Sequence, residues 1–156
     1  MKLIALTLNK ELIPSIHNVY EQNREILHEN IVTLDEWYNA FGEEADPYEE
    51  NFVIMADSIP AAWLKINGLN KETISISMLV VDDKFKHKGI GRFSLNYSED
   101  YARKNNKSVI LIYTTKDNTI AKMRYLKCEY EITRELVYKV GDGIDREGYE
   151  FKKIIA

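Results

Sequence analysis

The chain has 156 residues, of which 45% are apolar and 29% charged, and its formal net charge at pH 7 is −4. This length predicts one domain over residues 1–156, and the composition excludes disordered, collagen-like and coiled-coil chains. No apolar run approaches the roughly 20 residues of a membrane span, and the first residues lack a signal-peptide pattern. The single cysteine, Cys128, cannot form an internal disulfide and so favours a reducing, cytoplasmic location.

The first third of the chain predicts a short strand followed by two helices. Residues 2–7 form an apolar run typical of a strand, and residues 12–28 carry apolar side chains at helical spacing. Thr33 and Glu36 have the spacing of a capping box, which predicts a second helix over 34–41.

The remaining elements alternate strands with helices. In chain order they are strands at 52–56, 60–66 and 73–81, a helix at 89–105, a strand at 109–113, a helix at 118–127, and strands at 132–140 and 149–155. The strongest strand signal is 73–81, which is rich in β-branched residues. Strands linked by a helix pair in parallel and hairpins pair antiparallel, so we expect an α/β fold with one mixed sheet of about seven strands flanked by about four helices.

A basic turn containing two glycines joins the strand at 73–81 to the next helix. Four bases and a histidine lie between residues 84 and 92 with no acid among them: Lys84, Lys86, His87, Lys88 and Arg92. The first amides of a helix lack internal partners and sit at the positive end of its dipole, so this turn predicts a phosphate site. It lacks the Gly-Lys-Ser/Thr of a P-loop and the third glycine of a dinucleotide fingerprint. An ordinary strand-to-helix turn is the alternative.

Two blocks of sequence resemble the GNAT superfamily of N-acetyltransferases. The family's Arg/Gln-x-x-Gly-x-Gly/Ala block is occupied by Lys86-His87-Lys88-Gly89-Ile90-Gly91, in which Lys86 replaces the usual Arg or Gln. The family's Asn-x-x-Ala-x-x-x-Tyr block is matched by the run from Asn118 to Tyr125. The resemblance covers essentially the whole chain, although its specific motifs lie within 73–130. Glu129 and Tyr130 stand where the family often has Gly-Phe, so we expect the helix to end without the left-handed glycine cap.

The resemblance implies the GNAT fold, acetyl-CoA as cofactor and direct transfer of the acetyl group to an amine. It implies that the pantetheine arm pairs with a strand backbone, that the diphosphate meets the turn amides, and that an N–H near Leu79 or Val80 polarises the thioester. The implied cofactor-binding residues are Leu79, Val80, Val81, Lys86, His87, Lys88, Gly89, Ile90, Gly91, Arg92 and Asn118. Tyr125 corresponds to the general acid that protonates the CoA sulfur, and a simple packing role is its alternative.

The sequence assigns neither a general base nor a metal site. Ser75 and Ser77 are poor bases alone and Glu72 lies at the strand's start, which leaves a water chain to a cleft carboxylate as an option. The histidines His17, His28 and His87 fit surface or structural roles better than catalysis. No histidine or second cysteine has metal-ligand spacing near Cys128, so no metal is expected.

The charge distribution bears on the acceptor. Residues 1–50 hold 11 acidic and 3 basic residues. Five of the acids fall in one loop: Glu43, Glu44, Asp46, Glu49 and Glu50. We expect this acidic loop to lie beside the acceptor cleft and to favour a small-molecule amine that carries positive charge. Trp37, Tyr38 and Phe41 either line that cleft or form the core face of a helix.

Several alternatives stay open at this stage. A protein or peptide could be the acceptor if the groove is open at both ends, and a non-catalytic acyl-CoA-binding regulatory module could use the same fold. A pI of about 5.5 and a basic cluster without interleaved aromatic residues argue against nucleic acid as a partner. Because members of the family often form dimers, a homodimer is an expectation, with no interface assigned.

Overall fold

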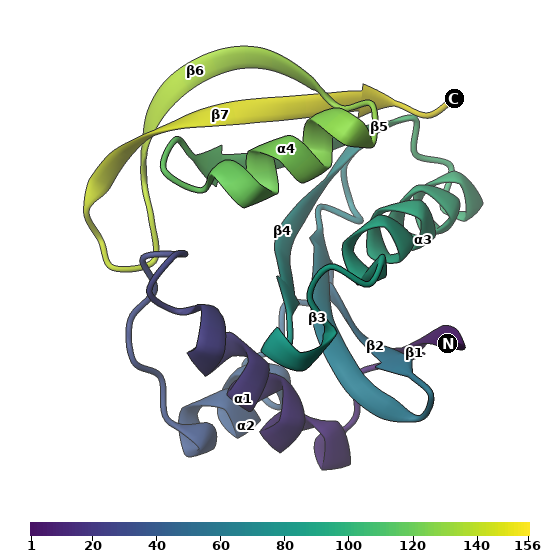
Figure 1. The fold of residues 1–156 in the computed structure, drawn as a ribbon, viewed down its shortest axis with the longest axis vertical. Coiled ribbons are helices and arrows are strands. Elements are labelled where there is room, and N and C mark those ends of the chain that lie inside the picture. Colours follow the sequence, from purple (N-terminus) through teal and green to yellow (C-terminus); the bar gives the residue numbers. More distant parts are fainter.

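The structure, a computed structural model, describes residues 1–156 and arranges them around one seven-stranded sheet (Figure 1). The strands are β1 (Leu3–Thr7), β2 (Glu50–Ala56), β3 (Ile59–Asn67), β4 (Thr73–Val81), β5 (Val109–Thr115), β6 (Glu131–Lys139) and β7 (Asp145–Ile154). The helices are α1 (Ile13–Asn23), α2 (Leu34–Phe41), α3 (Ile90–Lys104) and α4 (Thr119–Lys127), with short 3₁₀ turns at Lys10–Leu12 and Asp83–Phe85. The predicted fold class and the order of its strands and helices are confirmed.

The two central strands of the sheet separate along their length. The strand order is β1-β2-β3-β4-β5-β7-β6, and β4 with β5 is the one parallel pair. Their pairing stops at Ile76 opposite Ile112, whereas β4 stays paired with β3 as far as Val81 and β5 with β7 as far as Thr115. The carboxyl halves of β4 and β5 therefore face each other with unpaired backbone edges.

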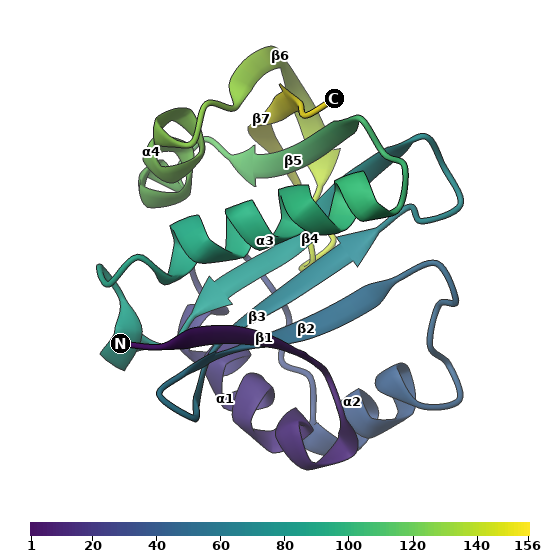
Figure 2. The same ribbon diagram turned by 90° about the vertical axis from the view of Figure 1, so that its right-hand side faces the viewer.

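The helices cover both faces of the sheet (Figure 2). One apolar cluster packs α3 and α4 against it, and another packs α1 and α2 against the opposite face. Neighbouring strand residues divide between the clusters, as Trp63 and Leu64 do on β3, because successive side chains of a strand point to opposite faces. None of the helices combines the length and the apolar character needed to cross a bilayer.

Two element boundaries differ from the sequence-based prediction by four residues or more. Helix α1 ends at Asn23 instead of residue 28, because the chain then turns away from the helix axis, and His28 takes a left-handed backbone with φ 54°. Strand β7 starts at Asp145 instead of residue 149. Its polar first residues have the composition of a turn, but pairing with β6 extends to Lys139 opposite Asp145 and holds them in the sheet.

The end of α4 shows how the chain does without the family's glycine. Glu129 itself takes the left-handed conformation, with φ 69°. The backbone N–H of Tyr130 then donates to the Tyr125 carbonyl at 3.0 Å, and the backbone N–H of Glu129 donates to the Leu126 carbonyl at 3.1 Å. These are the two hydrogen bonds of a Schellman motif. The helix thus keeps its left-handed cap, at the cost of placing a side chain where glycine is favoured.

Candidate active site

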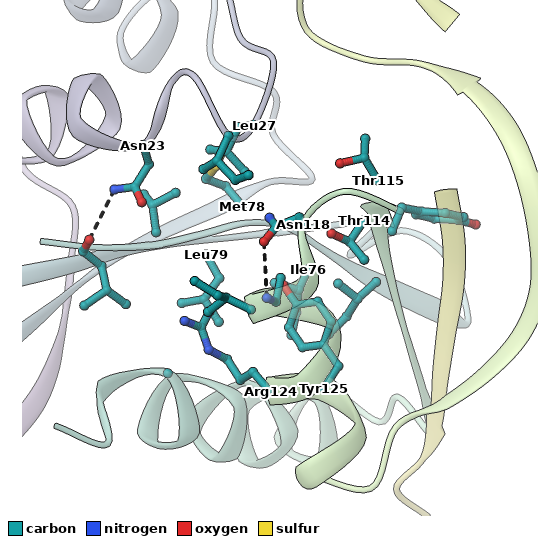
Figure 3. Close-up of a pocket in the computed structure, with 18 of the residues that line it drawn as sticks. Asn23, Leu27, Ile76, Met78, Leu79, Thr114, Thr115, Asn118, Arg124 and Tyr125 are labelled. Atoms are coloured by element: carbon teal, nitrogen blue, oxygen red, sulfur yellow. Dashed lines mark hydrogen bonds between the residues drawn. The ribbon is translucent and has the colours of Figure 1, made fainter. Parts of the chain in front are cut away.

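A cleft of about 950 Å³ opens where β4 and β5 separate. Its walls come from both strands, α4, the turn before α3, the segment after α1 and the β6–β7 hairpin (Figure 3). We name its two ends by their walls. The turn end is formed by residues 85–87 and 89–92 with Arg124, and the hairpin end by Ile26, Leu27, Glu29 and residues 138–141.

The turn end presents unpartnered backbone N–H groups. Gly89 is the N-cap of α3, and no side chain caps the first turn of this helix, so its first amides are available to an anion at the positive end of the dipole. His87 and Gly89 both have left-handed backbones, with φ 63° and 83°. Such residues are typical of backbone concavities that bind phosphate.

The basic side chains of the turn are not equivalent. Lys86 is directed toward α1, because its Nζ lies 2.8 Å from the Asp83 carboxylate and 3.3 Å from the Asn23 side-chain oxygen. Lys88 is the one predicted cofactor residue that does not line the cleft, and its Nζ lies 5.8 Å from the centroid of the Phe85 ring. The backbone of the turn therefore carries more of the expected phosphate binding than its lysines do.

Arg124 on α4 supplies a charge that the sequence analysis missed. It lines the turn end and lies so close to Gly91 that a Cβ there would be 2.5 Å from the arginine Nε. The absence of a side chain at 91 thus leaves room for the guanidinium beside the start of α3. The available signal was its place in the second family block, directly before Tyr125.

Tyr125 projects from α4 into the cleft (Figure 3). Its ring packs edge-on to Phe151 at a centroid distance of 5.2 Å, and only 6% of the residue is exposed. Burial raises the pKa of the Tyr125 hydroxyl, and the Arg124 charge lowers it by less. The hydroxyl therefore carries its proton at neutral pH, as a proton donor must.

Two asparagines fix the walls around this tyrosine. Asn118 caps α4 by accepting the amide of Ala121 at 3.2 Å, and it also lines the cleft. The buried Asn23, which the sequence analysis missed, donates to the Val81 carbonyl at 3.2 Å and to the Val19 carbonyl at 2.8 Å. Asn23 thereby ties the end of α1 to the end of β4.

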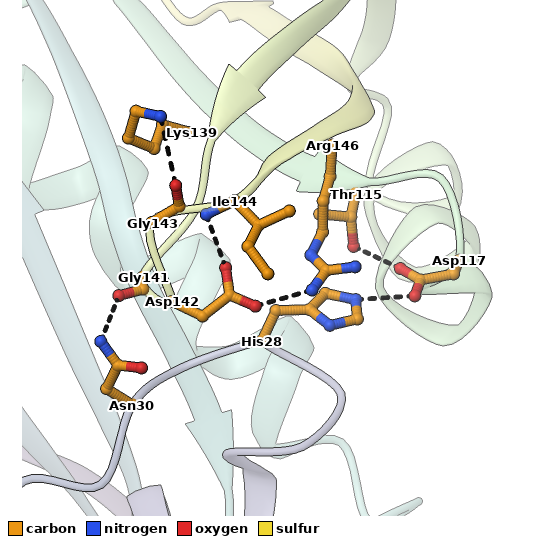
Figure 4. Close-up of polar contacts among 10 residues, drawn as sticks. All are labelled: His28, Asn30, Thr115, Asp117, Lys139, Gly141, Asp142, Gly143, Ile144 and Arg146. Carbon is orange, nitrogen blue, oxygen red and sulfur yellow. Dashed lines mark hydrogen bonds and ion pairs between the residues drawn. The ribbon is translucent and has the colours of Figure 1, made fainter.

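The hairpin end is closed by polar contacts between three segments (Figure 4). The His28 ring donates to the Asp117 carboxylate at 2.7 Å, and the backbone N–H of Asp142 donates to the His28 carbonyl at 2.8 Å. The side-chain amide of Asn30 donates to the Gly141 carbonyl at 3.0 Å. We name these five residues the clasp. His28 has the structural role that was expected of it.

The pKa of Asp117 in the clasp is lowered. A hydrogen bond from the Thr115 hydroxyl, at 2.5 Å, makes the largest contribution to this lowering. Burial opposes it with the next largest effect, and His28 adds to the lowering. The carboxylate of Asp117 is therefore ionised whenever the protein is near neutral pH.

Glu29 lies inside the clasp and is the one carboxylate that lines the cleft. Burial raises its pKa, Lys65 opposes this, and Asp142 adds to it. Sequence reasoning missed Glu29 because nothing in its neighbourhood forms a motif. Ser75 and Ser77 do line the cleft, whereas Glu72 does not.

One expectation about the acceptor side is wrong, and one open alternative is decided. None of the acids in the acidic loop lines the cleft, and three of them, Asp46, Glu49 and Glu50, line a separate cavity of about 430 Å³ beside α2. The aromatic residues of α2 do not line the cleft either. Trp37 is buried among the rings of other aromatic residues, so the core-face alternative holds for it: Tyr20, Phe41 and Trp63 are its partners, together with His17.

Comparison with known proteins decides the family. A family model described as "Acetyltransferase (GNAT) family" matches residues 13–130. The chain belongs to the GNAT acetyltransferase family. It is accordingly an N-acetyltransferase that uses acetyl-CoA as its acetyl donor. No curated protein matches the sequence.

Solved structures share the fold at low sequence identity. Spermidine N-acetyltransferase from Vibrio cholerae, in complex with CoA and spermine, is 19% identical, with a TM-score of 0.84 over 97% of this chain and 95% of its own. An N-acetyltransferase from Staphylococcus aureus Mu50 is 16% identical, with a TM-score of 0.80 over the whole of both chains. A dodecameric form of the Vibrio enzyme is 18% identical, with a TM-score of 0.77 over 98% of this chain and 94% of its own. At these identities the likeness shows the fold alone.

The cleft of this acetyltransferase suits acetyl-CoA. The uncapped amides of α3 and the Arg124 guanidinium suit its phosphates, and the unpaired edges of β4 and β5 suit its amide-bearing arm. All the predicted cofactor residues except Lys88 line this one cleft together with Tyr125.

Proposed function

We propose that this protein transfers the acetyl group of acetyl-CoA to a primary amine of a small molecule. The observation that carries the proposal is a single cleft with two different ends. One end offers free backbone N–H groups at the start of α3, and the other is enclosed by the clasp.

Each part of the cleft has a role in this proposal. The amides of residues 87–92 hold the diphosphate, with Arg124 as an additional cation. The backbone of β4 from Leu79 to Val81 aligns the pantetheine arm, and Asn118 contacts it from α4. The Asn23 hydrogen bond to the Val81 carbonyl keeps this part of β4 in place.

Tyr125 is proposed as the general acid. As the acceptor nitrogen bonds to the acetyl carbon and the carbon–sulfur bond breaks, the tyrosine hydroxyl donates its proton to the departing sulfur. The proton that the nitrogen then loses as the neutral amide forms restores the tyrosine through solvent. The raised pKa of Tyr125 keeps that proton available. The acceptor must lose its own ammonium proton before it attacks.

The clasp favours a small acceptor over a polypeptide. It joins the segment after α1 to the β5–α4 loop and to the β6–β7 hairpin, and Figure 1 shows the first and last of these meeting beside the sheet. A polypeptide needs a groove open at both ends, which this arrangement does not offer. Because the Vibrio enzyme is a spermidine N-acetyltransferase, a polyamine or another small cationic amine is the first acceptor to test.

The test measures thiol release from acetyl-CoA with a panel of polyamines, amino acids, aminoglycosides and lysine-bearing peptides. We expect turnover with at least one small amine and none with peptides. In the same preparation, acetyl-CoA at about 100 times its dissociation constant should raise the free energy of unfolding by roughly 2.7 kcal/mol. Turnover with peptides alone would overturn the choice of acceptor. Stabilisation without turnover on any amine would favour the non-catalytic regulatory module.

A homodimer and a cytoplasmic location also stay proposals. Sedimentation velocity on the purified chain, with and without CoA, measures the oligomeric state directly, and a monomer under both conditions would overturn the dimer. Fractionation of cells that express the chain tests the location.

A further inference from the structure

Glu29 is an uncompensated charge in a confined place. It is the one carboxylate in a cleft whose turn end is lined by three cationic residues, Lys86, Arg92 and Arg124. No hydrogen bond or ion pair within the chain engages its carboxylate, and the side chain is half-buried. Taking a carboxylate out of water without a partner is unfavourable, so a cation that reaches it is strongly attracted.

The neighbouring lysines do not neutralise it. Lys65 pairs with Glu49 at 3.8 Å, and Lys139 pairs with Asp145 at 3.4 Å while donating to the Gly143 carbonyl at 3.1 Å. Asp142 adds negative charge near Glu29, although Arg146 pairs with it at 2.6 Å. The hairpin end thus keeps a net preference for a positively charged group.

The carboxylate lies close to the hairpin. It lies against the backbone of Gly141, where a Cβ would be 1.8 Å from Glu29 Oε2. A residue with a side chain at 141 would push the carboxylate out of this position. Gly141 is itself held in the clasp by the Asn30 side chain.

The reacting groups lie elsewhere in the cleft. Tyr125 and Leu79 belong to one apolar cluster and line the cleft, whereas the Glu29 carboxylate lies at the hairpin end beside Gly141. A group bound by Glu29 is therefore a part of the acceptor away from the amine that reacts.

We propose that Glu29 binds a second, non-reacting ammonium group of the acceptor and so selects diamines and higher amines over monoamines. This rests on the proposed function, and it adds a specificity-determining residue to that same site. A charge-assisted hydrogen bond of this kind strengthens binding by roughly 10- to 100-fold.

The experiment compares straight-chain diamines with monoamines of equal length on wild type and Glu29→Gln. We expect kcat/KM for diamines to fall by roughly 10- to 100-fold in the variant, with monoamines changing less than about threefold and the KM for acetyl-CoA unchanged. The matched control is Glu43→Gln with Glu44→Gln, which removes negative charge from the acidic loop outside the cleft. It should leave the preference for diamines as it is.

A second variant separates position from charge. Gly141→Ala keeps Glu29 ionisable but displaces its carboxylate, so the same selective loss should appear in reduced size. Since the displaced atoms are the far end of a flexible side chain, this variant is expected to fold even if Glu29→Gln does not.

Calorimetric titration of a diamine into the CoA-bound protein gives a readout that does not need turnover. Selective binding that is lost in Glu29→Gln supports the proposal, even if no amine is acetylated and the proposed function fails. If wild type acetylates diamines and monoamines with equal kcat/KM, the proposal is overturned while the proposed function stands. Equal losses for both classes of amine in Glu29→Gln would also overturn it, as would the absence of diamine binding.

Discussion

The two ends of the cleft are built in different ways. The turn end comes from one continuous run, in which β4, the basic turn and the start of α3 follow each other directly. The hairpin end joins segments that are far apart in the chain, since its hydrogen bonds link His28 to Asp117 and Asn30 to Gly141. Binding at the turn end therefore depends on backbone conformation, and binding at the hairpin end on single side chains. This difference predicts which substitutions disable the protein and which only tune it.

The largest effect is expected from Gly89→Val. Gly89 has φ 83° and open space around its Cα, so the substitution acts through backbone conformation and disrupts the amides of the α3 start. We expect acetyl-CoA affinity, measured by calorimetry, to fall by at least about 100-fold, the equivalent of about two charge-assisted hydrogen bonds. Gly143→Val is the control, because Gly143 has a similar φ of 80° but lies outside the cleft. It introduces the same backbone strain and should leave acetyl-CoA affinity intact. Unchanged affinity in Gly89→Val would refute the assignment of the phosphate site.

Tyr125→Phe should have the next largest effect, on turnover instead of binding. Loss of the hydroxyl is expected to lower kcat by about 10- to 1,000-fold, with acetyl-CoA affinity nearly unchanged because the ring still packs on Phe151. Tyr130→Phe is the control, since this neighbouring buried hydroxyl has no hydrogen-bond partner. Burial raises the pKa of Tyr125 above the ordinary tyrosine value near 10. The kcat of wild type should therefore fall through loss of this proton donor only above about pH 10. A wild-type rate in Tyr125→Phe would make the tyrosine structural.

Asp117→Asn should weaken the clasp modestly. The Asp117 side chain is 56% exposed, so we expect a loss of only about 0.5 kcal/mol in the free energy of unfolding at pH 7. A lowered pKa means that this contribution is present above the ordinary value of 3.8 and is lost as the pH falls through the lower folded-state value. Melting temperatures of variant and wild type should therefore differ at pH 7 and converge in stronger acid. A difference that persists there would show that the charge of Asp117 is not what holds the clasp.

Glu129→Gly is expected to have the smallest effect, and it should stabilise the protein. The substitution relieves the strain of a left-handed backbone at φ 69° and keeps the Schellman hydrogen bonds. The free energy of unfolding, measured by urea denaturation, should therefore rise by up to about 1 kcal/mol. Glu129→Ala separates charge from conformation, because it removes the carboxylate and retains the strained backbone. Equal gains in the two variants would point to charge.

The same difference in construction explains what the sequence could predict. The turn end was predictable because its residues form a contiguous pattern, 86–91, with a second block ending at Tyr125. Glu29 and Asn23 were not, since their roles arise only when α1 is placed against β4 and the hairpin. The acidic loop led to a wrong expectation for the opposite reason. It is conspicuous in the sequence, but none of its carboxylates lines the cleft and three of them line another cavity. Local composition also misplaced the start of β7, which pairing with β6 decides.

The separation of β4 from β5 has a consequence for solubility. Unpaired strand edges invite other chains to pair with them and aggregate, and most proteins protect the outer edges of their sheets for that reason. Here the exposed edge is internal and is flanked on both sides by strands of the same sheet. The fold can therefore leave backbone hydrogen-bonding groups open for its cofactor without offering them to a neighbouring copy of itself.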